Sequence, residues 1–404
     1  MATSVELFSG AGGLALGLAQ AGFQHLLVTD YAENPITTLN SNRLHGHTHA
    51  SGWPILKSDV QHIDFTTIGT DVDLVSGGPP CQPFSLGGKH RGYHDDRDMF
   101  PQAVRSIREI EPKAFIFENV RGLLRKSFAR YFEYIILQLT YPNLKLREDD
   151  GWIDHLARLE QHHSSTCKSG LRYNVLYRSI NAANYGIPQK RHRVFIIGFR
   201  TDIDANWAFP AETHSEKQLW MSQWVTGDYW EQHEVPRHMR PPIPVKAKTY
   251  TQNPQGELPL FHQKERWITV RDAISDLPNP RTERRASAAF ANHEYRGGAR
   301  AYVGHTGSTW DQPAKALKAG DHGVPGGENM LRHTNGKVRY FTVRESARLQ
   351  TFPDRYVIEG SWTESMRQLG NAVPVSLGRI LGESIYKTLM DTQAETQLAI
   401  HEAH

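Results

Sequence analysis

The sequence predicts an α/β fold with a doubly wound, mostly parallel sheet and a second, smaller domain of irregular structure. The first observation is a series of short, β-rich apolar runs, at residues 5–8, 26–29, 72–75, 114–117, 173–180 and 193–199. The second is the presence of amphipathic stretches between these runs, and the third is the loss of any sustained period after Phe199. Buried strands that alternate with helices form parallel sheets covered by helices on both faces.

Helical periodicity appears both early and late in the chain. Residues 14–21 and 99–110 carry apolar side chains at helical spacing between predicted strands. Periodicity returns at residues 343–349 and 375–389, and the last stretch predicts a C-terminal helix. Residues 201–280 are rich in Trp, His, Gln and Pro without a period, which predicts irregular structure.

These patterns predict two domains. The chain has 404 residues, which suits two or three domains or one large domain with an insertion. We expect residues 1–203, completed by residues 369–404, to form the larger α/β domain. Residues 204–368, including the segment 340–356, form the smaller one.

The composition excludes several classes of protein. Hydrophobic residues make up 39% of the chain, which is enough for a core and excludes intrinsic disorder as the main description. Two cysteines cannot form a disulfide framework and favour a reducing compartment. No apolar run reaches the roughly 18 residues of a membrane helix, and a signal peptide's basic start is absent, so we expect a cytoplasmic protein. The net charge of +3 permits an anionic partner without requiring one.

A glycine-rich turn follows the first predicted strand, in the sequence Phe-Ser-Gly-Ala-Gly at residues 8–12. Glycines let the backbone approach a ligand at the carboxyl ends of the strands, where doubly wound sheets bind ligands. Asp30 closes the second strand and Asp59 follows the apolar pair at residues 55–56, positions where an acid typically binds a ribose diol. The spacing is not that of a dinucleotide site, so it predicts a nucleoside cofactor. Taken alone, the glycines are equally consistent with a structural turn.

Cys81 lies in a stiff loop, Gly-Gly-Pro-Pro-Cys-Gln-Pro at residues 77–83, directly after a predicted strand. A cysteine held between prolines at the ligand edge of a sheet is typical of a presented nucleophile, whose thiolate needs electropositive surroundings. Cys167 lies in a polar stretch without such a setting, and we interpret it as incidental.

Glu118 ends the strand predicted at residues 114–117, so it emerges at the same edge as Cys81. Burial raises the pKa of a carboxyl group, and such a group can donate a proton, although a solvated strand end is the simpler alternative. Arg191 and Arg193 alternate at the start of a later strand, so one can face a substrate atom while the other holds the framework.

Five arginines crowd a short segment of the smaller domain that carries only two acidic residues; they are Arg281, Arg284, Arg285, Arg296 and Arg300. Such a run is either a solvated basic loop or a surface for an anionic partner, and both interpretations stay open at this point.

Together, these segments resemble the cytosine-5 DNA methyltransferase family, of the prokaryotic modification-methylase type. The matching motifs occur in order: the turn at residues 8–12, Pro-Cys-Gln at 80–82, Glu-Asn-Val at 118–120, Gln-x-Arg-x-Arg at 189–193, Arg-Glu-Ser-Ala-Arg-Leu-Gln at 344–350 and Gly-Asn-Ala-Val-Pro at 370–374. Residues 201–335 are largely free of such motifs. Asp30 departs from the family, which more often has Glu there.

The resemblance implies a sheet of the S-adenosylmethionine-dependent methyltransferase type, with residues 204–368 as the target-recognition region. It also implies methyl transfer to carbon 5 of a cytosine flipped out of a specific short duplex DNA sequence. Cys81 would add to carbon 6, Glu118 would protonate ring nitrogen 3, and Arg193, with Arg191 nearby, would contact the cytosine carbonyl oxygen.

The same resemblance implies the cofactor contacts, which are Phe8, Ala11, Gly12, Asp30, Tyr31, Asp59, Val60, Met99, Asn371 and Val373. It implies no metal. The expected partners are double-stranded DNA, contacted by the arginine-rich segment, and a restriction endonuclease that shares the recognition sequence. We expect a monomer associated with the nucleoid.

Two alternatives remain from the sequence. An RNA enzyme of the same fold carries a Cys-Phe-Thr signature, and this chain has only Tyr-Phe-Thr at residues 340–342. A catalytically silent DNA-binding homologue would be free to lose the nucleophile or the acid, yet Cys81 and Glu118 are both present.

Overall fold

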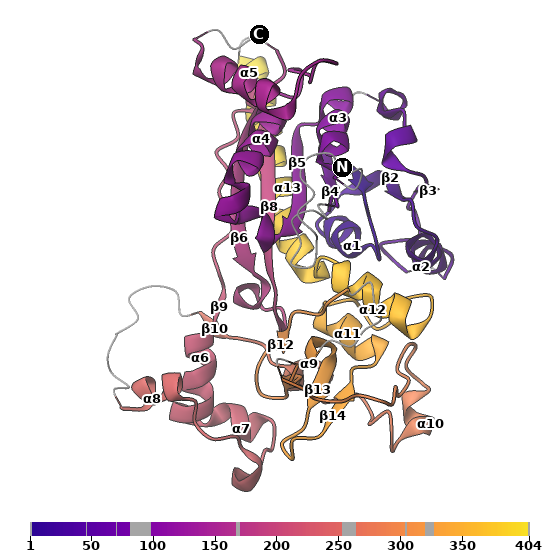
Figure 1. Ribbon diagram of the computed structural model, residues 1–404, viewed down its shortest axis with the longest axis vertical. Coiled ribbons are helices and arrows are strands. Elements are labelled where there is room, and N and C mark those ends of the chain that lie inside the picture. Colours follow the sequence, from indigo (N-terminus) through magenta and orange to yellow (C-terminus); the bar gives the residue numbers. More distant parts are fainter. Residues whose placement is uncertain are drawn as a thin grey trace. The chain divides into compact units, whose positions relative to one another are not determined.

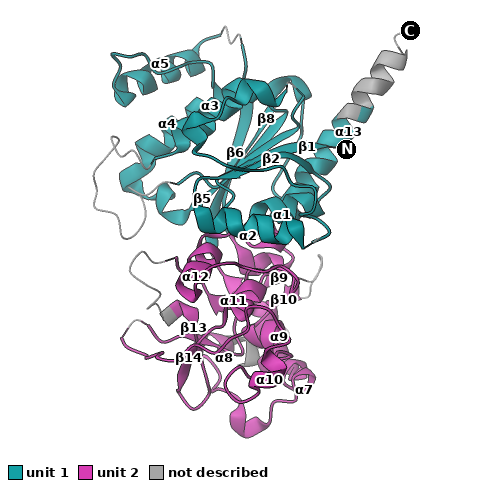
Figure 2. Cartoon of the chain, turned by 90° about the vertical axis from the view of Figure 1, so that its right-hand side faces the viewer, with its two compact units in different colours: residues 1–180, 192–210, 378–404 teal, residues 181–191, 211–377 magenta. Residues whose placement is uncertain are grey.

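The chain folds into two compact units. The computed structural model describes residues 2–45, 47–69, 71–80, 98–166, 170–252, 264–303, 305–319 and 327–402 (Figure 1). Unit 1 comprises residues 1–180, 192–210 and 378–404, and unit 2 comprises residues 181–191 and 211–377 (Figure 2). Two short segments that the sequence assigned to the larger domain, residues 181–191 and 369–377, therefore group with unit 2.

Unit 1 is built on a seven-stranded sheet with the strand order β3-β2-β1-β4-β5-β8-β6. Its strands are β1 (Thr3–Leu7), β2 (Gln24–Asp30), β3 (Ile55–Lys57), β4 (Leu74–Gly77), β5 (Ala114–Val120), β6 (Tyr173–Asn181) and β8 (His192–Arg200). β1 pairs in parallel with β2 and β4, β2 with β3, and β4 with β5, whereas β8 runs antiparallel to β5. The predicted doubly wound, mostly parallel sheet is confirmed, as are its six predicted strands.

Helices cover both faces of this sheet, as Figure 2 shows for α3 and α4 on one side and α1 and α13 on the other. Their bounds are α1 (Gly13–Gln20), α2 (Glu33–Leu44), α3 (Phe100–Ile110), α4 (Ala129–Thr140), α5 (Trp152–Ser164) and α13 (Val375–Glu402). α3 and α4 bury an apolar layer that includes Phe100, Ile107, Phe115 and Ile135. α13 packs closely on α1 because Gly382 has no side chain; a carbon there would lie 2.9 Å from Ala21.

A buried polar layer lies within unit 1. Burial raises the pKa of Glu6 in β1 to about 8, and the hydroxyl of Ser76 in β4 donates a hydrogen bond to its carboxyl group. Burial lowers the pKa of His25 to about 4, while its ring bonds the Ser4 hydroxyl at 2.9 Å and the Ala15 carbonyl at 2.8 Å. Desolvation dominates both shifts, so both side chains are held in their neutral forms at pH 7.

Unit 2 consists of short elements, as its aperiodic sequence predicts. Its helices are α6 (Glu216–Met221), α7 (Asp228–Gln232), α8 (Val245–Gln252), α9 (Val270–Ile274), α10 (Arg284–Ser287), α11 (Val343–Leu349) and α12 (Trp362–Asn371). Its strands are β7 (Gln189–Lys190), β9 (His214–Ser215), β10 (Glu265–Arg266), β11 (Ser308–Thr309), β12 (Ala314–Lys315), β13 (Met330–Arg332) and β14 (Val338–Tyr340). Two small apolar clusters stabilise it, one around Phe341 and Leu349 and one around Trp230 and Trp267. In the part of the chain that the structure describes, no helix is long and apolar enough to cross a membrane.

The buried carboxyl of Glu6 predicts a pH-dependent stability. Between pH 4.5 and 8 the folded state binds more protons at Glu6 than the unfolded state does, so this group lowers the free energy of unfolding as pH rises. Glu6→Gln keeps the shape and neutrality of the protonated carboxyl. We expect the variant to gain stability relative to the wild type by roughly 2–4 kcal/mol between pH 5 and pH 8.

Urea unfolding of both proteins at several pH values measures this difference, and taking the difference cancels the opposite contribution of His25. Glu148→Gln, at an exposed glutamate, is the control and should leave the pH profile unchanged. Parallel profiles for the wild type and Glu6→Gln would exclude a buried neutral carboxyl.

Candidate active site

The carboxyl ends of the parallel strands of unit 1 gather most of the residues predicted for the site. The turn at residues 8–12 follows β1, Asp30 ends β2, and Gly78 follows β4. Glu118 lies in the last part of β5. Ligands bind at this edge in open α/β sheets.

The glycine-rich turn has the backbone conformation that its sequence requires. Gly10 and Gly12 have φ values of 52° and 79°, and Phe8 has a φ of 54°, which is unusual for a residue with a bulky side chain. A carbon added at Gly10 would meet no other atom within 4 Å, so the turn presents bare backbone to open space. A non-glycine residue in the left-handed region at a ligand edge is typical of a functional turn.

Asp30 bonds this turn through one carboxylate oxygen and the residues after β2 through the other. Oδ2 accepts a hydrogen bond from the amide of Gly10 at 2.8 Å, and Oδ1 accepts one from the amide of Ala32 at 2.9 Å. The side chain is 8% exposed. Asp30 therefore organises the loop in addition to any contact it makes with a ligand.

The other predicted cofactor residues of unit 1 combine a polar acceptor with apolar surface. Asp59 begins a 3₁₀ turn, where its Oδ1 accepts the amide of Gln61 at 2.9 Å. Val60 and Ala11 are buried, whereas the ring of Tyr31 is 67% exposed directly after Asp30. Two carboxylates, an exposed aromatic ring and a bare backbone turn fit a nucleoside, which needs acceptors for its hydroxyls and a flat apolar contact for its base.

Glu118 and Asn119 hold the segment that leads to Cys81. The amide of Asn119 donates to the carbonyl of Pro79 at 2.9 Å, and a carbon added at Gly78 would lie 3.4 Å from Oε2 of Glu118. Cys81 itself lies outside the described residues, as does Cys167. The sequence motif assigns no role to Asn119, although the place of this residue next to Glu118 in Glu-Asn-Val is a signal for one.

Met99 lies at the start of α3, where its amide donates to the carbonyl of Pro80 at 3.0 Å. This hydrogen bond links Pro80 to Met99, which precede and follow residues 81–97 in the chain. The structure thus gives Met99 a contact through its main chain.

Glu118 forms an ion pair with Arg193. Nε of Arg193 lies 2.7 Å from Oε1 of Glu118, and the two side chains are only 16% and 10% exposed. The approach lacks the alignment of a hydrogen bond, so Oε1 keeps its acceptor capacity despite the close charge. The ion pair therefore holds the partly buried carboxylate of Glu118 in one position at this edge of the sheet.

Arg191 has different surroundings, within unit 2. It is fully buried, and its guanidinium donates to the carbonyls of Leu317 at 3.2 Å and Gly370 at 2.7 Å. The sequence left open which of the two motif arginines holds the framework. These hydrogen bonds to main-chain carbonyls give that role to Arg191. In the same unit, Asn371 is exposed and Val373 is buried.

The arginine-rich segment is exposed in unit 2. Arg284 and Arg285 lie on α10, and Arg300 lies on an irregular stretch. Arg281 and Arg296 stack on aromatic rings, at 5.8 Å from the Tyr295 centroid and 5.5 Å from the Trp362 centroid respectively. The five guanidinium groups therefore form an exposed basic surface, which both interpretations of the sequence allow.

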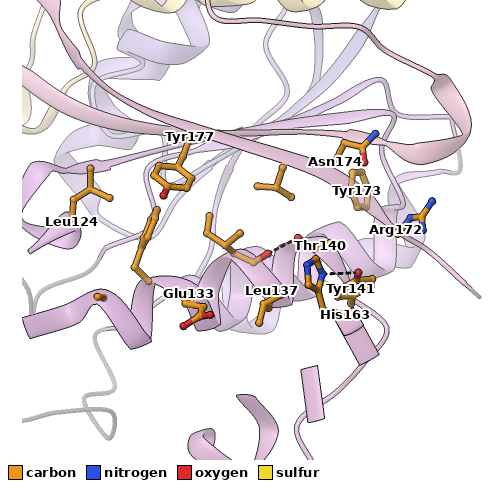
Figure 3. Close-up of a pocket in the computed structure, with 14 residues that line it drawn as sticks. Leu124, Glu133, Leu137, Thr140, Tyr141, His163, Arg172, Tyr173, Asn174 and Tyr177 are labelled. Carbon is orange, nitrogen blue, oxygen red and sulfur yellow. Dashed lines mark hydrogen bonds between the residues drawn. The ribbon is translucent and has the colours of Figure 1, made fainter. Parts of the chain in front are cut away.

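A cavity of about 930 Å³ lies elsewhere in unit 1, between α4 and β6 (Figure 3). Phe132, Ile136, Tyr173 and Tyr177 line it, together with polar groups such as Arg172. No residue predicted for the site lines this cavity. This cavity is therefore separate from the residues predicted for the active site.

Comparisons with known proteins agree on one family. A family model described as C-5 cytosine-specific DNA methylase matches residues 2–143 and 156–387. The chain is 33% identical to the Type II methyltransferase M.PspPI of Psychrobacter sp. (strain TA137), over 95% of this chain and 79% of that protein. It is 31% identical to the Type II methyltransferase M.Eco47II of Escherichia coli, over 96% of this chain and 79% of that protein.

Solved structures share the fold. One is a putative DNA modification methyltransferase encoded within an E. coli prophage, with a TM-score of 0.54, 21% identity, and coverage of 96% of this chain and 99% of that one. Another is the Spodoptera frugiperda DNMT2 mutant, with a TM-score of 0.55, 14% identity, and coverage of 96% and 100%.

The double role of Asp30 predicts a loss of stability on its removal. Asp30→Ala leaves the partly buried amides of Gly10 and Ala32 without their acceptors, which should lower the free energy of unfolding by roughly 1–2 kcal/mol without any ligand. Thermal and urea unfolding measure this loss. Asp64→Ala is the matched control, because Asp64 also accepts two hydrogen bonds but at an exposed 3₁₀ turn. Equal stability of Asp30→Ala and the wild type would remove Asp30 as the organiser of the turn.

Proposed function

Because the chain belongs to the C-5 cytosine-specific DNA methylase family, we propose that it methylates carbon 5 of a cytosine in a specific short duplex DNA sequence, with S-adenosylmethionine as methyl donor. The observation that carries the proposal is the Glu118–Arg193 pair, at the sheet edge beside the segment that leads to Cys81. Since relatives are named type II methyltransferases, we further propose that the methylation protects DNA from a partner restriction endonuclease.

Cys81 is the proposed nucleophile. Its thiolate adds to carbon 6 of the cytosine, and the electrons of the carbon 5–carbon 6 double bond make carbon 5 nucleophilic toward a methyl group. After methyl transfer, a base removes the proton from carbon 5 and the thiolate leaves carbon 6, which restores the ring. The target carbon lies inside the duplex, so the base must leave the stack, at a cost of a few kcal/mol that protein–DNA contacts offset.

Glu118 assists the addition. A proton delivered by Glu118 to ring nitrogen 3 neutralises the negative charge that develops when the thiolate adds. Nε of Arg193 lies 2.7 Å from the Glu118 carboxylate and Nη1 donates to the carbonyl of His192, so Nη2 is the group proposed to contact the cytosine carbonyl oxygen. Arg191, buried against main-chain carbonyls, supports this framework and does not touch the base.

The cofactor contacts are proposed for the turn at residues 8–12 and for the residues that follow β2 and β3. Asp30 and Asp59 would accept the nucleoside hydroxyls, Tyr31 and Val60 would contact the base, and Phe8, Ala11, Gly12 and Met99 would complete the set, with Asn371 and Val373 of unit 2. When bound, S-adenosylmethionine supplies an electrophilic methyl group on its sulfonium.

A covalent trap tests the nucleophile. Bisulfite sequencing of a plasmid from a host that expresses the protein first identifies the methylated site. A duplex with 5-fluorocytosine at that site should then become covalently attached to the protein in the presence of S-adenosylmethionine, because fluorine on carbon 5 cannot leave as a proton does. Cys81→Ala should abolish the adduct and methylation while it changes duplex affinity by less than about tenfold.

The chain offers its own control for the trap, since it has only two cysteines. Cys167→Ala should form the adduct at the wild-type level. An adduct that persists in Cys81→Ala would show that another residue is the nucleophile.

Charge reversal tests the proposed DNA contacts of the arginine-rich segment. Arg284→Glu together with Arg285→Glu should weaken DNA binding and reduce the slope of log affinity against log salt by up to about 2, because fewer counterions are released. Titrations at several salt concentrations measure the slope. Cofactor affinity should not change.

The matched control reverses two exposed cations of unit 1, Lys145→Glu with Arg147→Glu, in the stretch that the family model leaves unmatched. This pair should leave the slope unchanged. A slope in the Arg284/Arg285 variant that equals the wild-type slope would return the segment to a solvated loop.

A further inference from the structure

The turn at residues 370–374 of unit 2 is held by buried side chains. It connects α12, which ends at Asn371, to α13, which begins at Val375. The chain leaves the helix at Ala372, where φ is −62° and ψ is 144°. The last carbonyls of a helix have no partners within the helix, so their direction depends on what else bonds them.

Gln350 supplies these partners from a different element. It follows α11 directly and is fully buried. Its side-chain amide donates to the carbonyl of Leu369 at 2.5 Å and to that of Ala372 at 3.2 Å, and its main-chain carbonyl accepts the amide of Val375 at 3.0 Å. One residue therefore bonds the main chain on both sides of the turn.

Arg191 holds the middle of the same turn. Its guanidinium donates to the carbonyl of Gly370 at 2.7 Å and to that of Leu317 at 3.2 Å. The backbone is close-packed at this point, since a carbon added at Gly370 would lie 2.4 Å from the amide nitrogen of Ala319. A cation at the carboxyl end of α12 also meets the negative end of the helix dipole.

Burying an amide and a guanidinium costs free energy, and apolar residues of similar volume would fill the same space without that cost. The amide and the guanidinium fix the orientation of the main chain, because each hydrogen bond holds one carbonyl in one direction. Asn371 is exposed, and the carbonyls of the residues before and after it in the chain, Gly370 and Ala372, are the ones that these groups bond.

We propose that Gln350, together with Arg191, is a positioning residue for the cofactor. The two side chains hold the turn that carries Asn371 and Val373 in its binding conformation. This inference rests on the proposed function, which assigns Asn371 and Val373 to the cofactor.

Gln350→Met tests the inference, since methionine has a similar volume and cannot donate. We expect the dissociation constant for S-adenosylmethionine, measured by calorimetry, to rise by roughly tenfold, which corresponds to the loss of one or two hydrogen bonds. The Michaelis constant for S-adenosylmethionine should rise with it, while kcat should stay within about threefold. Gln350→Asn, which keeps a shorter amide, should give a smaller rise and covers the case in which the methionine variant does not fold.

The matched control is Gln223→Met. Gln223 is a buried glutamine of the same unit whose amide donates to the carbonyl of Asp311 at 2.7 Å, away from the turn. We expect a similar loss of thermal stability without a change in cofactor affinity. Equal effects of the Gln223 and Gln350 variants on cofactor affinity would mean that Gln350 acts through general stability, and would overturn the inference.

Asn371→Ala separates this inference from the proposed function. If Asn371→Ala weakens cofactor binding and the Gln350 variants do not, the positioning role is wrong and the proposed function stands. If the Gln350 variants weaken binding in parallel with Asn371→Ala, the inference is supported. If the wild type itself binds no S-adenosylmethionine, the proposed function fails, and the inference fails with it.

Discussion

The antiparallel pairing of β8 with β5 is the constraint on which the candidate active site depends. The neighbours of β5 on its other side are parallel strands, whose carboxyl ends form the ligand edge. Because β8 runs the opposite way, its amino end arrives at that edge and brings Arg193 opposite Val120, within reach of Glu118. A slip of one residue would turn Arg193 to the other face of the sheet. The register of one strand pair thus decides whether the proposed acid has a cation beside it.

Side chains add to the main-chain hydrogen bonds that hold the loops at the strand and helix ends, such as the bond from the amide of Ser9 to the carbonyl of Thr29 in β2. In unit 1, Asp30 accepts one amide from the turn after β1 and one from the residues after β2, and Asn119 donates to Pro79. In unit 2, Gln350 and Arg191 donate to the carbonyls of one turn. These hydrogen bonds fix the loops in place. No further strand or helix has to cover the loops to hold them, so their backbone can remain accessible to a ligand.

The buried polar layer of unit 1 shows a different balance. Glu6 and His25 lie within the sheet layer and are kept neutral by desolvation. Such groups stay in a core only when each has a hydrogen-bond partner, and here Ser76 and Ser4 supply them. This region is therefore sensitive to pH in a way that the apolar layer under α3 and α4 is not.

The sequence by itself determined six strands of the sheet, the flanking helices α1, α3 and α13, and the order of the motifs, whereas it did not predict α2, α4 or α5. Apolar runs of strand length and the 3.6-residue period of α3 and α11 depend on local pattern, and a pattern read along the chain finds them. α2 was missed because two residues of its buried face, Thr38 and Asn42, are polar, so the helical spacing of that face carries no apolar pattern. The identity of Cys81, Glu118 and the two arginines as candidates also came from sequence, through local motifs and the strand ends on which they lie.

Only the tertiary structure decided what each of these residues contacts. The sequence left open which of Arg191 and Arg193 holds the framework, since alternation along a strand says that they differ and not what each meets. It gave no role to Asn119 or Gln350, because their partners at Pro79 and Ala372 come from distant or irregular segments. It also placed residues 181–191 with the larger domain, whereas their bonds to Leu317 and Gly370 join them to unit 2. Contacts between residues far apart in sequence follow from the packing of the whole chain, which no local pattern encodes.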